Sequence, residues 1–294
     1  MPGGVPDGMS DYSQRFLFDD TDIRGEIVQF EASYQGVVAD HQYPLAVARL
    51  LGEFLSASVL LGSTIKFDGR LVLQARGDGE LNVVVAECRH DGSIRGIARL
   101  GQTVDGQDFA ALLGEGTLVM TVEPAVGKSY QSLVPLTGGS LAACLEYYFQ
   151  QSEQLMTKIW LSADNHRAGG LLLQQLPRQL VMDPEARVRQ WEHAVILADT
   201  TRPEELLDLA AETLLQRLYA AEPIRIQSPS AVIFSCSCSL TRTANALVLL
   251  GKDEVDSLFA DMPEVVMGCE FCGKDYRFTR ESLAEALLAG EVPH

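Results

Sequence analysis

Hydrophobic residues change their spacing along the chain, and these changes predict where helices and strands lie. Between Tyr43 and Leu61 apolar side chains recur every three or four positions, which is typical of a buried amphipathic helix, and Pro44 suits its first turn. A second helix is predicted for Ser140–Leu155, with Ser140 as its N-cap. Short apolar runs that end at glycine-containing turns are typical of strands. The strands predicted in this way are Leu71–Ala75, Leu81–Ala86, Ile94–Leu100, Gly116–Glu123 and Ser132–Leu136.

The same pattern predicts strands on either side of this block. Phe16–Phe30 is expected to form a first strand that is broken at Arg24-Gly25. Ile159–Leu161 and Leu171–Leu176 are expected to form the last two strands, with Ala168-Gly169-Gly170 as the turn between them. The fold class that follows is α+β, with an N-terminal core of mostly antiparallel sheet and packed helices.

Two further helices are predicted beyond this core, at Pro184–Ala198 and Pro203–Tyr219. Thr201 and Glu204 have the spacing of a capping box before the second helix. Each helix has an apolar face that must be buried, and the preceding core offers the surface for it. A DNA-binding helix-turn-helix is disfavoured because this segment is rich in acidic residues and poor in basic ones. Residues 179–230 are therefore interpreted as a helical linker.

The chain is thus expected to have three parts. Residues 10–178 form the α+β core domain, the helical linker follows, and residues 231–294 form a small C-terminal zinc-binding domain. This last part has few large apolar side chains, and units of that size usually need a metal or a disulfide to fold. The Pro- and Gly-rich segment Met1–Gly8 is expected to be disordered.

Four cysteines in the C-terminal part carry the clearest chemical signal. Cys236 and Cys238 form one close pair, Cys269 and Cys272 form another, and thirty residues separate the pairs. Two short loops that each offer two sulfurs are typical of a tetrahedral metal site. Zn²⁺ suits four thiolates because it is borderline-soft and accepts this geometry. We therefore predict one zinc ion per chain, bound by these four cysteines.

The same sulfurs can also be oxidised. Cys269 and Cys272 have the C-x-x-C spacing that closes readily into a disulfide, and Cys236 could be linked to Cys238 in a tighter ring. The thiolate is both the metal ligand and the form that oxidants attack, so metal binding and disulfide formation compete. Cys88 and Cys144 stand alone in predicted core elements and are interpreted as packing residues.

Composition narrows the possible functions. A formal net charge of −17 disfavours binding to nucleic acid, whose non-specific affinity is mostly electrostatic. No apolar run is expected to cross a bilayer, and no N-terminal signal is evident, so a cytoplasmic protein with reduced thiols is predicted. A hydrolytic zinc site would need an open position, whereas four cysteines fill all positions. A thiol oxidoreductase would place its C-x-x-C near a β-α-β unit, and none is predicted.

With these residues placed, the chain resembles the redox-regulated 33 kDa chaperonin family of bacterial heat-shock holdases. The C-terminal Cys-x-Cys and Cys-x-x-Cys pattern, Phe234-Ser-Cys236-Ser-Cys238 and Cys269-Glu-Phe-Cys272-Gly273, is that family's signature. The similarity runs from about Phe16 to Phe278. The other matching segments are Ile23-Arg24-Gly25-Glu26, Lys66-Phe67-Asp68-Gly69, Gly77-Asp78-Gly79, Arg95-Gly96-Ile97-Ala98-Arg99, Leu141 to Leu155 and Gly169 to Pro177.

The resemblance implies an ATP-independent chaperone that is not an enzyme and is inactive while reduced and zinc-bound. On oxidation, Cys269 pairs with Cys272 and Cys236 pairs with Cys238, zinc is lost, and the small domain unfolds. The linker then loosens, and exposed apolar surface binds unfolding client proteins. The resemblance also implies a homodimer in the oxidised form and transfer of clients to ATP-dependent refolding chaperones. The alternatives from other classes are a constitutive zinc-stabilised protein-binding module and a thiol oxidoreductase.

Overall fold

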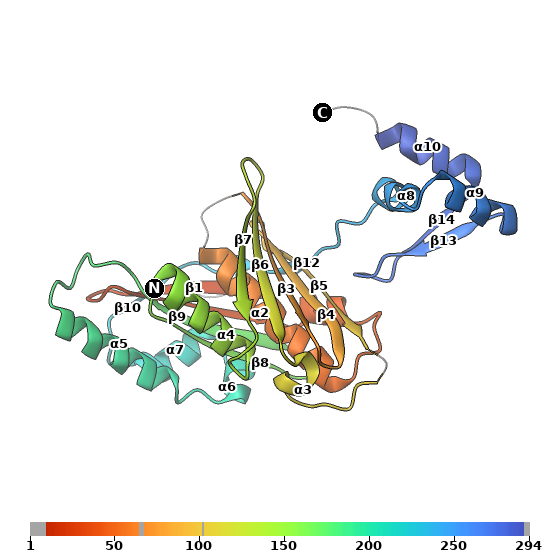
Figure 1. The fold of residues 1–294 in the computed structure, drawn as a ribbon. Coiled ribbons are helices and arrows are strands. Elements are labelled where there is room, and N and C mark those ends of the chain that lie inside the picture. The colour runs from red at the N-terminus through yellow and green to blue at the C-terminus, as the bar shows by residue number, and fades with distance from the viewer. Residues whose placement is uncertain (1–9, 65–67, 102, 291–294) are drawn as a thin grey trace. The chain divides into compact units, whose positions relative to one another are not determined.

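The computed structural model describes residues 10–64, 68–101 and 103–290 (Figure 1). The predicted disorder of Met1–Gly8 and the family motif at Lys66-Phe67 lie outside these residues. Contacts between residues divide the chain into two compact units, with the boundary between Phe234 and Ser235. Each unit is described by itself. The architecture is α+β with antiparallel sheets, as the sequence predicts.

The first sheet of the larger unit has the order β10-β1-β2-β9-β8, and β11 also pairs with β1. Its pairings are antiparallel throughout. The strands are β1 (Tyr12–Phe18), β2 (Ile23–Phe30), β8 (Thr157–Ala163), β9 (Ala168–Gln175), β10 (Ile224–Ile226) and β11 (Ser230–Ala231).

The second sheet has the order β12-β5-β4-β3-β6-β7, and only the short β12 pairs in parallel, with β5. Asp91-Gly92 lies in the β4–β5 turn, as the sequence predicts, and Gly92 has the positive φ of 80° that such a turn needs. The strands are β3 (Gly69–Gly77), β4 (Leu81–Arg89), β5 (Ser93–Leu100), β6 (Gly116–Pro124), β7 (Tyr130–Pro135) and β12 (Ile233–Phe234).

Helix α2 (Leu45–Thr64) lies between the two sheets and is buried on nearly every side. Glycines make room for it on both. A Cβ at Gly170 of β9 would lie 2.8 Å from Leu60, and a Cβ at Gly96 of β5 would lie 3.0 Å from Leu51. The result is one continuous apolar core that joins both sheets through a single helix.

The length and composition of α2 correct one expectation. By these two measures it could cross a membrane, although the sequence analysis expected no such run. Within the protein, 78% of its apolar window is buried, so it serves here as a core helix.

Shorter helices border this core: α1 (Ala32–Val38), α3 (Phe109–Leu113) and α4 (Leu141–Tyr148). Ser140 caps α4, and its side chain accepts a hydrogen bond from the amide of Ala143, as predicted. The predicted helix ends early because α4 passes into a π-helical turn, η1 (Phe149–Glu153), which Gln154 terminates with a φ of 55°. The sequence analysis missed α1 and α3.

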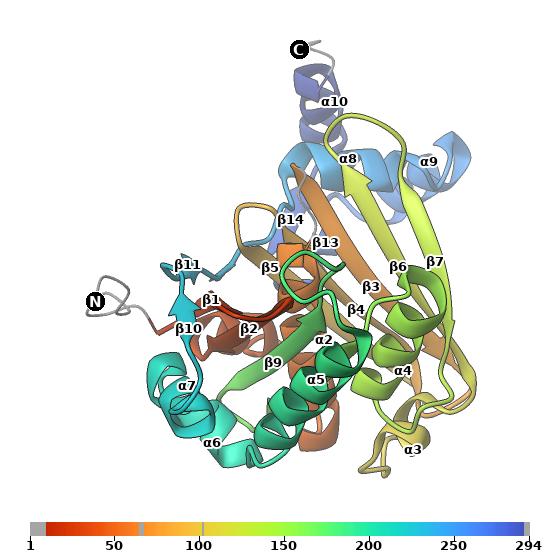
Figure 2. The same cartoon turned by 90° about the vertical axis from the view of Figure 1, so that its left-hand side faces the viewer.

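Three helices cover the opposite face of the first sheet: α5 (Pro184–Ala198), α6 (Pro203–Asp208) and α7 (Ala211–Tyr219) (Figure 2). The single predicted helix over 203–219 is interrupted because the sheet supplies partners for the backbone at the break. Gln29 donates to the carbonyls of Leu206 and Leu209 at 2.7 Å each, and Tyr12 Oη accepts from Ala211 at 3.0 Å. The predicted capping box of Thr201 and Glu204 does not form; instead, Glu205 accepts from the amide of the N-cap residue Arg202 at 3.0 Å, which is one half of such a box.

Two predicted turns are wrong for a related reason. The break in Phe16–Phe30 falls at residues 19–22, whereas Gly25 lies within β2, where a Cβ would meet the ring of Phe16 at 2.1 Å. Gly169 and Gly170 likewise lie inside β9. The turn before β9 is formed by Asp164, whose carboxylate accepts from the amides of His166 and Arg167. These glycines serve close packing and not chain reversal.

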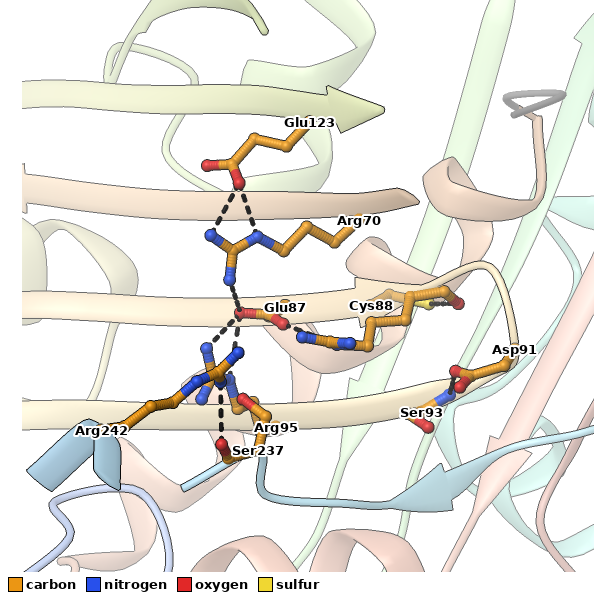
Figure 3. A network of polar contacts seen from close by, with 10 residues as sticks. Arg70, Glu87, Cys88, Asp91, Ser93, Arg95, Glu123, Ser237 and Arg242 are labelled. Carbon is orange, nitrogen blue, oxygen red and sulfur yellow. Dashed lines mark hydrogen bonds and ion pairs between the residues drawn. The ribbon is translucent and has the colours of Figure 1, made fainter. Parts of the chain in front are cut away.

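One buried carboxylate ties three strands of the second sheet together (Figure 3). Glu87 of β4 is 4% exposed and accepts from Arg95 of β5 at 2.6 Å and from Arg70 of β3 at 3.3 Å. Arg70 continues the network to Glu123 of β6 at 2.6 Å. Each buried charge therefore has a partner of opposite sign on a neighbouring strand, which fixes the register of the sheet.

The partly buried carboxyl group of Glu53 has no ion-pair partner in the described part of the chain and should make stability depend on pH. Burial raises the pKa of Glu53, on α2, to about 7 from 4.5. A raised carboxyl pKa means that the folded state binds the proton more tightly, so the unfolding free energy falls as pH rises from about 4.5 to 7. We expect Glu53→Gln to stabilise the protein by about 1–2 kcal/mol at pH 8, with a smaller effect at pH 5. Denaturant titrations at both pH values measure this. Glu192→Gln, at an exposed carboxylate, is the control, and an equal effect of Glu53→Gln at both pH values would contradict the interpretation.

Candidate metal centre

The smaller unit has a small apolar core. Its elements are α8 (Leu240–Val248), α9 (Lys252–Asp261), β13 (Val265–Gly268), β14 (Asp275–Phe278) and α10 (Arg280–Gly290). The buried apolar residues are Ala244, Leu247, Val265, Tyr276, Phe278, Leu283 and Ala286. The second cysteine pair lies between the two strands of the β13–β14 hairpin, and Thr279 accepts from the amide of Ser282 at the start of α10.

The hairpin of β13 and β14 positions the second cysteine pair. Cys269 follows β13 directly, and its amide donates to Lys274 O at 2.9 Å. Its carbonyl accepts from the amides of Cys272 at 3.3 Å and Gly273 at 2.8 Å. Gly273 has a φ of 64°, a left-handed conformation that favours glycine. This tight turn brings the sulfurs of Cys269 and Cys272 to the same side of the loop.

The first cysteine pair lies just before α8. Ser239 caps this helix by accepting from the amide of Arg242, and the Arg242 side chain donates to Ser237 O at 2.8 Å. Both contacts hold the chain between Cys236 and the helix in a defined path. The sequence favours this conformation because serine at an N-cap satisfies a free amide of the first turn.

The two loops bring all four predicted sulfurs together. The Sγ atoms of Cys236, Cys238, Cys269 and Cys272 lie within 4.8 Å of one another. Cys236 Sγ is 3.6 Å from Cys269 Sγ, and Cys238 Sγ is 3.4 Å from Cys272 Sγ. None of the four is joined in a disulfide, and all are partly buried.

These distances fit a bound ion. Tetrahedral coordination with metal–sulfur bonds of about 2.3 Å places ligand sulfurs about 3.8 Å apart, whereas a disulfide bond is about 2.05 Å long. The observed separations lie close to the first value. Four soft donors within one coordination sphere can therefore hold a metal ion.

Tyr276 is part of this site, and the sequence analysis did not identify its role. Its hydroxyl donates to Cys238 Sγ at 3.1 Å. Burial raises the pKa of the Cys238 thiol, but the hydrogen bonds from Tyr276 and from the neighbouring thiols outweigh this and lower the pKa to about 7. Burial and the hydrogen bonds with the other three thiols raise the pKa of Cys272 to about 12. Polar and apolar residues alternate in β14, and this alternation turns Tyr276 inward. It was the signal in the sequence that could have indicated the role of Tyr276.

The two remaining cysteines belong to the larger unit and not to the cluster. Cys88 is at the end of β4 and Cys144 is in α4, and both are buried in the apolar core of the larger unit. Burial raises the pKa of Cys88 to about 12, so its thiol stays protonated. Packing remains the role that their surroundings support.

Comparison with known proteins places the chain among relatives of nearly equal length. The model of the Hsp33 protein family matches residues 11–279. A 33 kDa chaperonin of Pseudomonas paraeruginosa is 49% identical over 284 residues, which cover 96% of this chain and 95% of that protein. A 33 kDa chaperonin of Azotobacter vinelandii is 49% identical over 283 residues, with 95% of each chain covered.

A solved structure shares the fold. The crystal structure of the 33 kDa chaperonin (heat shock protein 33 homolog) from Thermotoga maritima matches with a TM-score of 0.80 at 21% identity. The match covers 95% of this chain and 98% of that one. The family match over nearly the whole chain and the relatives at 49% identity show that the chain belongs to the Hsp33 family.

Proposed function

We propose that this protein is a redox-regulated, ATP-independent molecular chaperone whose switch is the four-cysteine cluster. The observation that carries the proposal is the approach of four sulfurs from two loops within 4.8 Å, in a unit with a very small apolar core. Zn²⁺ is the ion we propose, because four thiolates in tetrahedral positions match its preference. Family membership supports the chaperone function and a role other than catalysis.

The proposed organisation follows from the stability of the parts. Residues 10–178 act as the core domain, 179–230 as a helical linker and 231–294 as the switch domain. A structural zinc site contributes about 10–16 kcal/mol in small peptides, which exceeds the net stability of most domains. Loss of the ion is therefore sufficient to unfold the switch domain, and the linker is then free to leave the first sheet.

Oxidation removes the ligands. Two thiolates lose two electrons to hydrogen peroxide and become joined by one sulfur–sulfur bond. These two electrons, together with two protons, convert the peroxide to two molecules of water. We propose the pairs Cys236–Cys238 and Cys269–Cys272. The shortest sulfur contacts run between the loops, yet disulfides there would fasten the loops together as the ion does. Only disulfides within each loop leave the two loops unconnected, so this pairing is the one that can release the fold.

The released surface binds unfolding client proteins in the cytoplasm and keeps them from aggregating. We further propose that the oxidised form is a homodimer and that clients pass to ATP-dependent refolding chaperones after reduction. A constitutive zinc-stabilised module would keep its binding activity in both redox states, which the first experiment below distinguishes.

The main test treats reduced, zinc-loaded protein with peroxide at raised temperature. We expect zinc release, measured with a chromogenic chelator, to coincide with suppression of client aggregation, measured by light scattering. Peptide mapping of the product should find the two disulfides within the loops. Protein that releases zinc and still lets the client aggregate would refute the chaperone proposal.

Removing one ligand pair tests the structural role of the cluster. We expect Cys269→Ser with Cys272→Ser to abolish tight zinc binding and to unfold residues 235–290, because two serines do not replace thiolate ligands. Amide hydrogen exchange should show lost protection in this segment. Light scattering of a client should show partial chaperone activity without oxidant. Cys144→Ala, which removes a buried thiol outside the cluster, should retain the zinc. A doubly substituted protein that stays folded and zinc-bound would contradict the proposal.

Tyr276 offers a milder test. Tyr276→Phe removes the hydrogen bond to Cys238 Sγ but keeps the buried ring. Partners in this position orient metal ligands, and their loss typically weakens metal binding about 10–100-fold. We expect zinc competition with a chelator to show a loss in this range while the circular dichroism spectrum is unchanged. Unaltered zinc affinity would assign the hydroxyl no role in the site.

A further inference from the structure

The hairpin of β6 and β7 presents an unusual apolar edge. In both views it extends beyond the neighbouring strands of the second sheet (Figures 1 and 2). Large apolar side chains are exposed along it: Val126 is 91% exposed, Leu133 is 74% exposed and Tyr130 is 55% exposed. β7 is the last strand of its sheet, so its outer side carries no strand among the residues that the structure describes.

The backbone of this edge is available for pairing. The amide of Leu136, just after β7, donates to the carbonyl of Gly116 at the start of β6, so alternate residues of β7 direct their amides inward. The intervening residues, Gln131 and Leu133, direct theirs outward. Pro135 occupies the next outward-facing position after Gln131 and Leu133. It has no amide hydrogen to donate, and proline is common at such positions of a sheet edge. Two donors and their carbonyls therefore form a short template for an added strand.

Charge does not protect this edge. Residues 125–139 contain a single charged residue, Lys128, in a chain with a net charge of −17. Natural edge strands usually carry charged side chains that prevent pairing with other chains. Residues 125–139 contain no acidic residue, which lowers the electrostatic repulsion that a polypeptide meets when it approaches this edge.

We propose that β7 binds extended apolar segments of client proteins by adding them to the second sheet as a further strand. This inference rests on the proposed chaperone function. A second copy of the chain is the weaker candidate for this edge, because six paired residues bury far less than the about 1,200 Å² typical of a stable interface. An unfolding client offers extended, uncharged stretches that match the strand.

Pairing over six residues is weak, so β7 contributes to client binding only together with surface that oxidation frees. Two weak contacts on one client raise the overall affinity well above either alone. The edge is therefore exposed in the reduced protein without holding clients there, and it becomes effective after the switch domain has opened.

Two substitutions test the edge without touching the cysteines. Leu133→Lys replaces the exposed apolar anchor, and Gln131→Pro removes one outward amide at an edge position that tolerates proline. We expect each oxidised variant to need at least threefold more protein for the same suppression of client aggregation, with zinc release unchanged. Leu45→Lys, which places the same charge at a 45% exposed leucine on α2, should behave like the parent protein.

The outcomes separate the two proposals. Edge variants that suppress aggregation as well as the parent would overturn the β7 inference and leave the chaperone function intact. Parent protein that fails to suppress aggregation after zinc release would refute the chaperone function itself. If Leu133→Lys converts an oxidised dimer to a monomer in sedimentation, β7 pairs with a second copy and the client assignment is wrong. Circular dichroism and hydrogen exchange of β6 confirm that each variant keeps the sheet.

Discussion

We propose that the fold of residues 235–290 depends on the meeting of four sulfur atoms. The apolar core of this unit is small, and two of its seven buried members are alanines. Burial of so little apolar surface does not offset the entropy of ordering more than fifty residues. The polar contacts of the unit converge on the same place: the turn at Gly273, the cap at Ser239 and the hydroxyl of Tyr276 all orient sulfur. Stability and chemistry therefore reside in one cluster.

The larger unit is built on the opposite principle. α2 is buried between two sheets, and glycines on both sheets admit it closely. The helices α5 to α7 bury a second apolar cluster on the far face of the first sheet. The Arg–Glu network around Glu87 adds charge pairing between strands. The core around α2 contains none of the four clustered cysteines, so it can serve as a permanent scaffold beside the parts that the switch is proposed to change.

Sequence reasoning succeeded where the signal was local. The cysteine spacing, the cap at Ser140 and the Asp91-Gly92 turn depend on neighbours in the chain. It failed where the local structure is determined by residues that are distant in the sequence. The break between α6 and α7 is set by Gln29 and Tyr12, and Gly25 and Gly169 serve packing that no local pattern reveals. Tyr276 was missed because its partner, Cys238, lies 38 residues away in sequence.

The short strands β10, β11 and β12 have a consequence for synthesis of the protein. They lie between Ile224 and Phe234, yet β10 and β11 complete the edge of the first sheet on β1, and β12 completes the second on β5. In a nascent chain that has emerged only as far as α5, the edges at β1 and β5 are therefore still uncovered. The ribosome must deliver the linker helices and these last strands before the scaffold closes, and the first cysteine of the cluster follows two residues later. Folding of the scaffold and exposure of the thiols to the cell thus occur almost together in time.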